Sequence, residues 1–152
     1  MAFTNKGLYH RDNVYYRNAA EPTNFYVALC TNATPPTQDT NTLGQLTEIA
    51  AGNGYTTGGY QLARNSTDFD VLTEDDTNDR SFVQVKNVVF TAAGGPIPLS
   101  GSGARWAVFT DDNATIANRE VFTYWDLGSD RSVTDGNPLT IADLTFRSTG
   151  SP

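Results

Sequence analysis

The sequence is poor in the residues on which covalent and catalytic chemistry usually depends. Its 152 residues include a single cysteine, Cys30, and a single histidine, His10. One cysteine excludes an intrachain disulfide and a cysteine-rich metal site. A nucleophilic site would need His10 as its base, but His10 lies beside Arg11 and Asp12 in a predicted helix rather than at a strand end. We therefore expect a non-enzymatic protein without a cofactor, stabilised by packing or by assembly.

Long apolar segments and an excess of positive charge are also missing. No stretch approaches the roughly 20 apolar residues of a membrane helix, and no apolar run of signal-peptide type follows Lys6. We therefore expect synthesis in the cytoplasm and no membrane contact. The 10 basic and 17 acidic residues give a formal net charge of -7, which disfavours sequence-independent binding to nucleic-acid phosphates. Direct nucleic-acid binding is therefore not expected.

Turn-forming residues are abundant, and they separate short apolar segments. Only 38% of the residues are hydrophobic, whereas Gly, Pro, Asn, Asp, Ser and Thr are common. Strands are predicted at residues 25–30, 60–64, 81–91, 104–110, 119–127 and 139–147, and a short strand or a helical turn at 45–51. The first of these is apolar on both faces, so it should be central and Cys30 should be buried in it. About six to eight strands predict an all-β fold, an antiparallel β-sandwich or jelly roll.

Two finer predictions concern how the strands run. Alternation in 81–91 slips near Lys86 and Asn87, which predicts a bulge or a change of sheet there. In the last three strands, alternation places the following residues on shared faces: Trp106 with Val108; Val121 with Thr123 and Trp125; and Ala142 with Leu144 and Phe146.

The chain divides into an arm, a body and a tail. Residues 1–24 should form a short helical or extended arm, with Thr4 or Asn5 as N-cap. Residues 25–147 should form the sandwich, and 148–152 a loose tail. Residues 31–44 contain Pro35 and Pro36 and predict a long surface loop. Loops of this length tend to be functional or disordered, so this loop is a candidate for partner contact.

The acidic segments allow more than one interpretation. Residues 68–79 have clustered carboxylates, but they lack the glycine and the final glutamate of a helix-loop-helix calcium site. Either a solvated acidic loop or an irregular cation site would fit, and Asp111-Asp112-Asn113 allows the same two interpretations. Glu120 and Asp126 lie in a predicted strand among Arg119 and aromatic residues, where surface pairs are expected. A carboxylate pair of glycosidase type is not excluded by counting.

The order of several short segments resembles that of small bacteriophage virion proteins, described as capsid cement, decoration or tail-fibre-like proteins. A helical N-terminus and a Pro/Thr-rich loop accompany FYVALCT (25–31), LTEI (46–49), GGYQLAR (58–64), NVVFTA (87–92), ARWAVFT (104–110) and LTI (139–141). In that family a YVAL strand, an acidic residue, a GGYAR-like segment and an F-x-A strand end recur. The likeness covers residues 1–147. This chain departs from the family pattern in two places, between Glu48 and Tyr60 and at 68–79, where its segments are longer.

The resemblance implies a jelly-roll-like protein displayed on the outer surface of a phage capsid after synthesis in the host cytoplasm. Its partners would be the major capsid protein and further copies of itself, as a dimer or trimer. We expect Tyr9, Tyr15, Tyr16, Pro35 and Pro36 to form the protein interface. Two alternatives remain: a tail or head-fibre component that contacts host glycans, and a free carbohydrate-binding module or hydrolase. The exposed aromatic residues, with Trp106 and Trp125, would then bind sugar.

Overall fold

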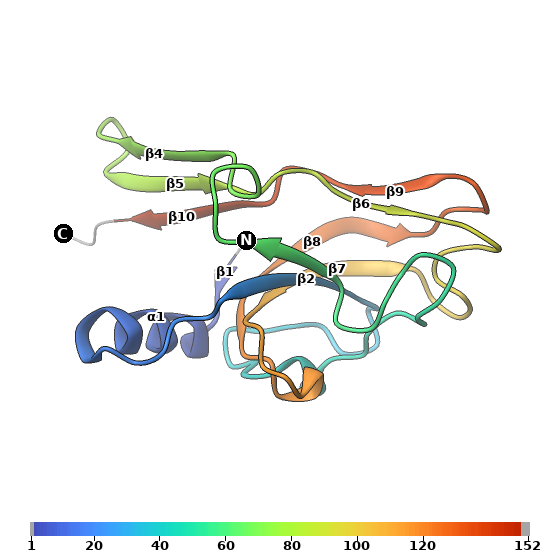
Figure 1. Ribbon diagram of the computed structural model, residues 1–152, viewed down its shortest axis with the longest axis horizontal. Helices are drawn as coiled ribbons and strands as arrows, with labels where there is room; N and C mark the ends of the chain where they lie inside the picture. Colours follow the sequence, from blue (N-terminus) through green and yellow to red (C-terminus); the bar gives the residue numbers. More distant parts are fainter. Residues whose placement is uncertain (1, 150–152) are drawn as a thin grey trace.

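Antiparallel strands make up most of the regular structure, and one helix lies near the N-terminus (Figure 1). The computed structural model describes residues 2–149. The strands are β1 (Ala2–Phe3), β2 (Asn24–Cys30), β3 (Tyr60–Ala63), β4 (Val71–Asp75), β5 (Arg80–Gln84), β6 (Val88–Thr91), β7 (Ala104–Thr110), β8 (Val121–Arg131), β9 (Pro138–Ile141) and β10 (Thr145–Thr149). Helix α1 spans Asn5–Arg17, and two 3-10 turns lie at Leu43–Gln45 (η1) and Ile116–Asn118 (η2). Within residues 2–149, no helix has the length and apolar character needed to cross a membrane.

The first layer is a five-stranded antiparallel sheet in the order β1-β8-β7-β2-β3. Strand β2 pairs with β7 on one side and with β3 on the other, and its residues from Val27 to Cys30 are fully buried. The predicted central position of this strand is confirmed. Burial, with a smaller effect of the Glu48 carboxylate, raises the pKa of the Cys30 thiol. The thiol therefore stays protonated at neutral pH.

The second layer consists of two short ladders, a three-stranded sheet in the order β10-β5-β4 and a two-stranded sheet of β6 and β9. Figure 1 shows them end to end along one side of the five-stranded sheet. Between them, the Val85 N–H donates to the Leu144 carbonyl (2.9 Å). The main apolar core includes Leu29 and Phe109 from the first layer and Phe146 from the second. The fold is thus β-sandwich-like, with antiparallel sheets, as the sequence predicts in outline.

Two predicted strands are each divided between the two ladders. Residues 81–91 contain all of β5 but its first residue and the whole of β6. These two strands lie in different sheets, so the predicted change of sheet near Lys86 and Asn87 is confirmed. The single strand predicted at 139–147 is wrong, because β9 ends at Ile141 and β10 begins at Thr145. Between them Asp143 has φ 59°, a left-handed conformation that breaks an extended chain. Residues 68–79 are not simply a loop, since they contain β4, which pairs with β5.

A β-bulge overturns one predicted face of β8. The register pairs Phe109 with Thr123 but Thr110 with Val121, so Phe122 is an extra residue on β8. Val121 consequently packs in a smaller core with Cys30, whereas Trp125 packs in the main core. They do not share a face as predicted.

Loops and both 3-10 turns cover the opposite face of the five-stranded sheet. Leu43 of η1 packs there with Cys30, and Ile116 of η2 packs against the same cluster. The segment 31–44 is therefore only partly exposed. At the other end of the chain, Ser148 and Thr149 of the predicted loose tail pair with β5 in β10. Residues 150–152 of that tail lie outside the described part of the chain.

Candidate functional site

Helix α1 is fixed to the start of β8 by its first turn. Thr4 is the N-cap: its hydroxyl accepts a hydrogen bond from the Gly7 N–H (2.9 Å) and donates one to the Val121 carbonyl. Gly7 lies directly on β8, since a Cβ there would be 2.5 Å from both the Cα and the carbonyl oxygen of Phe122. The helix therefore approaches the strand backbone as closely as glycine permits.

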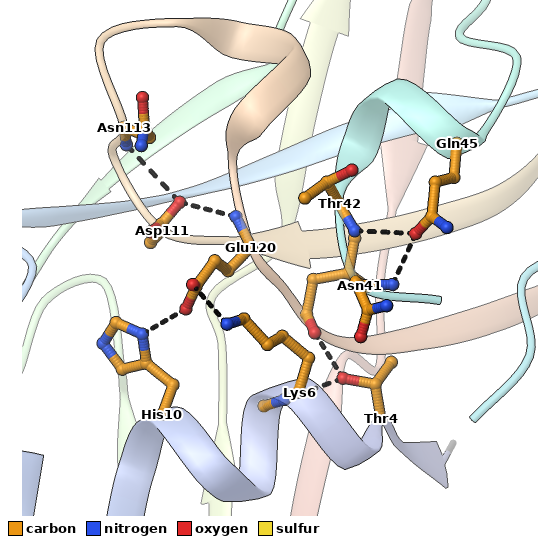
Figure 2. A network of polar contacts seen from close by, with 11 residues as sticks. Thr4, Lys6, His10, Asn41, Thr42, Gln45, Asp111, Asn113 and Glu120 are labelled. Carbon is orange, nitrogen blue, oxygen red and sulfur yellow. Dashed lines mark hydrogen bonds and ion pairs between the residues drawn. The ribbon is translucent and has the colours of Figure 1, made fainter. Parts of the chain in front are cut away.

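This close approach places two polar residues of α1, Lys6 and His10, against Glu120, which lies just before β8 (Figure 2). Lys6 and His10 are four residues apart, so they project from the same face of the helix. Lys6 Nζ lies 2.9 Å from Glu120 Oε1, and His10 Nδ1 lies 2.5 Å from Glu120 Oε2. The side chains of Lys6, His10 and Glu120 are 31%, 18% and 24% exposed. One carboxylate thus binds both residues in a partly desolvated position.

Asp111, directly after β7, completes the polar cluster. Its Oδ1 accepts hydrogen bonds from the N–H groups of Glu120 (2.8 Å) and Asn113 (3.4 Å). The Asp111 N–H donates to the Glu120 carbonyl (3.2 Å). Asp111 and Glu120 therefore fix each other's positions across the connection between β7 and β8.

The electrostatic environments of the two carboxylates differ. Burial alone would raise the pKa of Glu120, but hydrogen bonds from Lys6 and His10 outweigh it and lower that pKa. Burial raises the pKa of Asp111, against the opposing effect of the N–H groups that it accepts from. The other ring nitrogen of His10, Nε2, is buried and has no hydrogen-bond partner in the described part of the chain. His10 also packs edge-on against Phe122, with ring centroids 4.9 Å apart.

The three predicted interface tyrosines lie on this same helix. Tyr9, Tyr15 and Tyr16 are 59%, 80% and 76% exposed, and the rings of the last two are in edge-to-face contact at 5.0 Å. Lys6 lies over the Tyr9 ring at 5.5 Å from its centroid. Exposed aromatic residues held on a fixed helix are suited to contact another macromolecule. We call Tyr9, Tyr15 and Tyr16 the tyrosine face.

The predicted proline loop lies next to α1, although its two prolines differ. Pro35 is exposed, whereas Pro36 is buried in the protomer and is not at the accessible surface. The loop contacts the helix through the Asn5 N–H, which donates to the Gln38 carbonyl (2.8 Å), and through Asn5 Nδ2, which donates to Asp39 Oδ1 (2.9 Å). The structure therefore brings the two predicted contact segments together.

Comparison with known proteins identifies no relative of this chain. The chain matches no protein-family model, no curated protein and no solved structure. Function is therefore argued from the arrangement of its own residues.

Three further residues of the segments singled out from the sequence, Trp125, Trp106 and Asp75, have partners within the fold. Trp125 is 7% exposed and its indole N–H donates to the Thr145 carbonyl (3.0 Å), so it presents no face to a sugar. Trp106 is half-buried and donates to Asn32 Oδ1 (3.1 Å). In the acidic segment, Asp75 pairs with Arg80 (2.7 Å).

Sequence reasoning did not assemble the polar cluster. It noted Asp111 as part of a cation-loop alternative, Glu120 as a member of a surface pair, and His10 as a helix residue. His10 and Glu120 are 110 positions apart, so only the packing of α1 on β8 reveals their contact. The available signal was the four-residue spacing of Lys6 and His10 on one helix face.

Proposed function

We propose that this protein is a non-enzymatic structural component of a bacteriophage particle, a capsid cement protein that binds major capsid subunits on the outer surface of the shell. The observation that carries the proposal is the tyrosine face, three exposed aromatic residues on a helix fixed to the sandwich. The family resemblance of residues 1–147 supplies the kind of partner. The proposal includes a jelly-roll variant of the sandwich, supported by its two opposed antiparallel layers.

The tyrosine face has the chemistry of a protein-binding surface. Tyrosine gives a large contact area, a polar tip and few rotatable bonds, and it is enriched among residues that dominate interface energies. Tyr15 and Tyr16 hold each other through ring contact, which reduces the conformational entropy lost when they are covered. The loop that carries the exposed Pro35 contacts the first turn of the same helix through Asn5.

A rigid body suits the proposed role. Cement proteins bridge neighbouring subunits, and many repeated contacts raise avidity without a tight single site. Here α1 is capped, lies directly on the β8 backbone and is paired through Lys6 and His10 to Glu120. A contact made by the tyrosine face is therefore transmitted to the sandwich. We propose that the protein acts as a homodimer or homotrimer, which places several tyrosine faces on one assembly.

The test is binding to shells that lack the protein. Wild-type protein should co-sediment with such shells and raise their resistance to heat. Tyr15→Ser with Tyr16→Ser should weaken binding by roughly tenfold or more, because hot-spot aromatic residues typically contribute this much. The same change should alter the free energy of unfolding by less than about 0.5 kcal/mol, since both side chains are exposed.

A matched control uses another exposed apolar residue that belongs to neither the helix nor the proline loop. Leu72 on β4 is 76% exposed, and Leu72→Ser should leave shell binding unchanged. Equal loss of binding in both variants, or absence of binding by the wild type with unchanged shell stability, would contradict the proposal. Light scattering of the free protein would report whether it is a dimer, a trimer or a monomer.

The second candidate function is a tail or head-fibre component that contacts host glycans. The same tyrosine face favours it, because exposed aromatic rings pack against sugar rings. Glycan-array binding that is lost in the Tyr15→Ser, Tyr16→Ser variant, together with a labelled copy seen on the tail, would favour this function over the capsid role.

A further inference from the structure

The polar cluster beneath α1 contains a set of metal-ligand atoms. His10 from the helix, Asp111 after β7 and Glu120 before β8 each offer one ligand atom, and these atoms all lie within 4.8 Å of one another. His10 is far in the sequence from Asp111 and Glu120, so the set forms only in the folded chain. No other such group of three is found among residues 2–149.

The geometry is close to what a small divalent ion requires. Zinc binds histidine nitrogen and carboxylate oxygen at about 2.0 to 2.2 Å in tetrahedral geometry, so its ligand atoms lie roughly 3.3 to 3.6 Å from one another. His10 Nδ1 and Glu120 Oε2 are now 2.5 Å apart, and a small side-chain rotation would admit the ion between them. One imidazole nitrogen favours a transition metal over calcium or magnesium, which prefer oxygen alone.

Groups around the cluster already orient the two carboxylates. Lys6 holds Glu120 Oε1, which leaves Oε2 directed at His10. Two backbone N–H groups hold Asp111 Oδ1. Such outer contacts fix ligand orientation in metal sites and strongly affect affinity. The Lys6 ammonium has a second effect, since its positive charge opposes the binding of a cation.

We propose that His10, Asp111 and Glu120 bind one zinc-like divalent ion, with water completing its coordination. The ion takes the place of the hydrogen atom between His10 Nδ1 and Glu120 Oε2, and the neutral imidazole then carries its proton on Nε2. Binding joins α1 to the connection between β7 and β8 by coordination bonds in addition to hydrogen bonds. The inference concerns the isolated chain and stands whether or not the capsid role is correct.

The test is titration of metal-free protein with zinc chloride in a calorimeter. We expect one ion per chain and a higher melting temperature that a chelator reverses. Magnesium and calcium at the same concentration should not reproduce the effect. Because His10 is the only histidine, the nitrogen NMR signals of one imidazole report directly whether Nδ1 binds the ion.

Three variants separate a metal site from a simple ion-pair network. His10→Gln and Asp111→Asn should each weaken zinc binding by at least about tenfold, while Lys6→Met should strengthen it because the competing charge is removed. Asp126→Asn is the control, as Asp126 is an exposed carboxylate of β8 paired with Arg105. Absence of zinc binding by both the wild type and Lys6→Met, unchanged zinc affinity in folded His10→Gln, or an unmoved imidazole signal would each overturn the proposal.

Discussion

At the scale of single residues, two carboxylates show opposite responses to the protein around them. Asp68 is buried, Lys86 Nζ lies 2.5 Å from its Oδ1, and the Ala63 N–H donates to its Oδ2 (2.7 Å). The hydrogen bond from Lys86 holds the pKa of Asp68 below its ordinary value of 3.8, although burial opposes this. For Glu48, burial is the largest effect and raises its pKa, despite hydrogen bonds from Tyr55 and Gly58.

Asp68→Asn should destabilise the protein at neutral pH. The asparagine amide has one acceptor oxygen for two donors, Lys86 Nζ and the Ala63 N–H, and it cannot form an ion pair with Lys86. We therefore expect the free energy of unfolding to fall by about 2 kcal/mol. Because folding lowers the pKa of Asp68, its stabilisation is complete above pH 3.8 and is lost as the pH falls through the lower folded-state value. Urea unfolding of both proteins should show the difference shrinking in that acidic range. A pH-independent difference would contradict the ion-pair explanation.

Glu48→Gln should be tolerated at neutral pH. Tyr55 and Gly58 both donate to Glu48 Oε1, and the amide oxygen of glutamine can accept both bonds while removing a partly buried charge. We expect the free energy of unfolding at pH 7 to stay within about 1 kcal/mol of the wild type. Folding raises the pKa of Glu48, so the ionised carboxylate lowers the stability of the wild type above the folded-state pKa. The wild type regains this stability as the pH falls through the folded-state pKa. The glutamine variant should lack this gain in a pH series.

At the scale of elements, the close contact between α1 and β8 depends on Gly7, which has no side chain. Alanine is a better helix former than glycine by about 1 kcal/mol, so Gly7→Ala would stabilise an isolated helix. In this protein the added Cβ would lie 2.5 Å from backbone atoms of Phe122. The Phe122 backbone cannot move aside without shifting the helix or the bulge.

Gly7→Ala should therefore destabilise the protein, by about 1 to 3 kcal/mol as overpacked sites do. Chemical unfolding measures this loss. The control is Tyr16→Ala on the exposed face of the same helix, for which we expect a change within about 0.5 kcal/mol. A stabilised Gly7→Ala protein would mean that α1 does not lie as closely on β8 as described.

The elements that the sequence predicts well are those with uninterrupted alternation. The segments 25–30 and 104–110 match β2 and β7 to within one residue, because all of their residues are buried or half-buried in the centre of the sheet. The break after β9 escaped prediction because Asp143 adopts a left-handed conformation that a period-two pattern does not reveal. The bulge at Phe122 and the cluster of His10 with Glu120 depend on long-range packing, which one sequence does not encode locally.

At the scale of the whole molecule, the sandwich separates structural and contact roles. Apolar clusters on both faces of the five-stranded sheet stabilise the body, while α1 and the neighbouring loop carry exposed aromatic residues and Pro35. The polar cluster lies where these two parts meet. A change there, such as metal binding, therefore acts at the junction between the helix and the sandwich.

The inaccessible thiol of Cys30 makes selective labelling straightforward. Cys30 is the only cysteine in the sequence and is fully buried in β2, so thiol reagents will not reach it in the folded protein. Ser129→Cys, at an exposed position of β8 outside the tyrosine face and the polar cluster, would introduce one reactive sulfur without altering the proposed contact surface. A fluorophore or a gold cluster attached there would mark a single known point on each copy, and its position on intact particles could be read by microscopy.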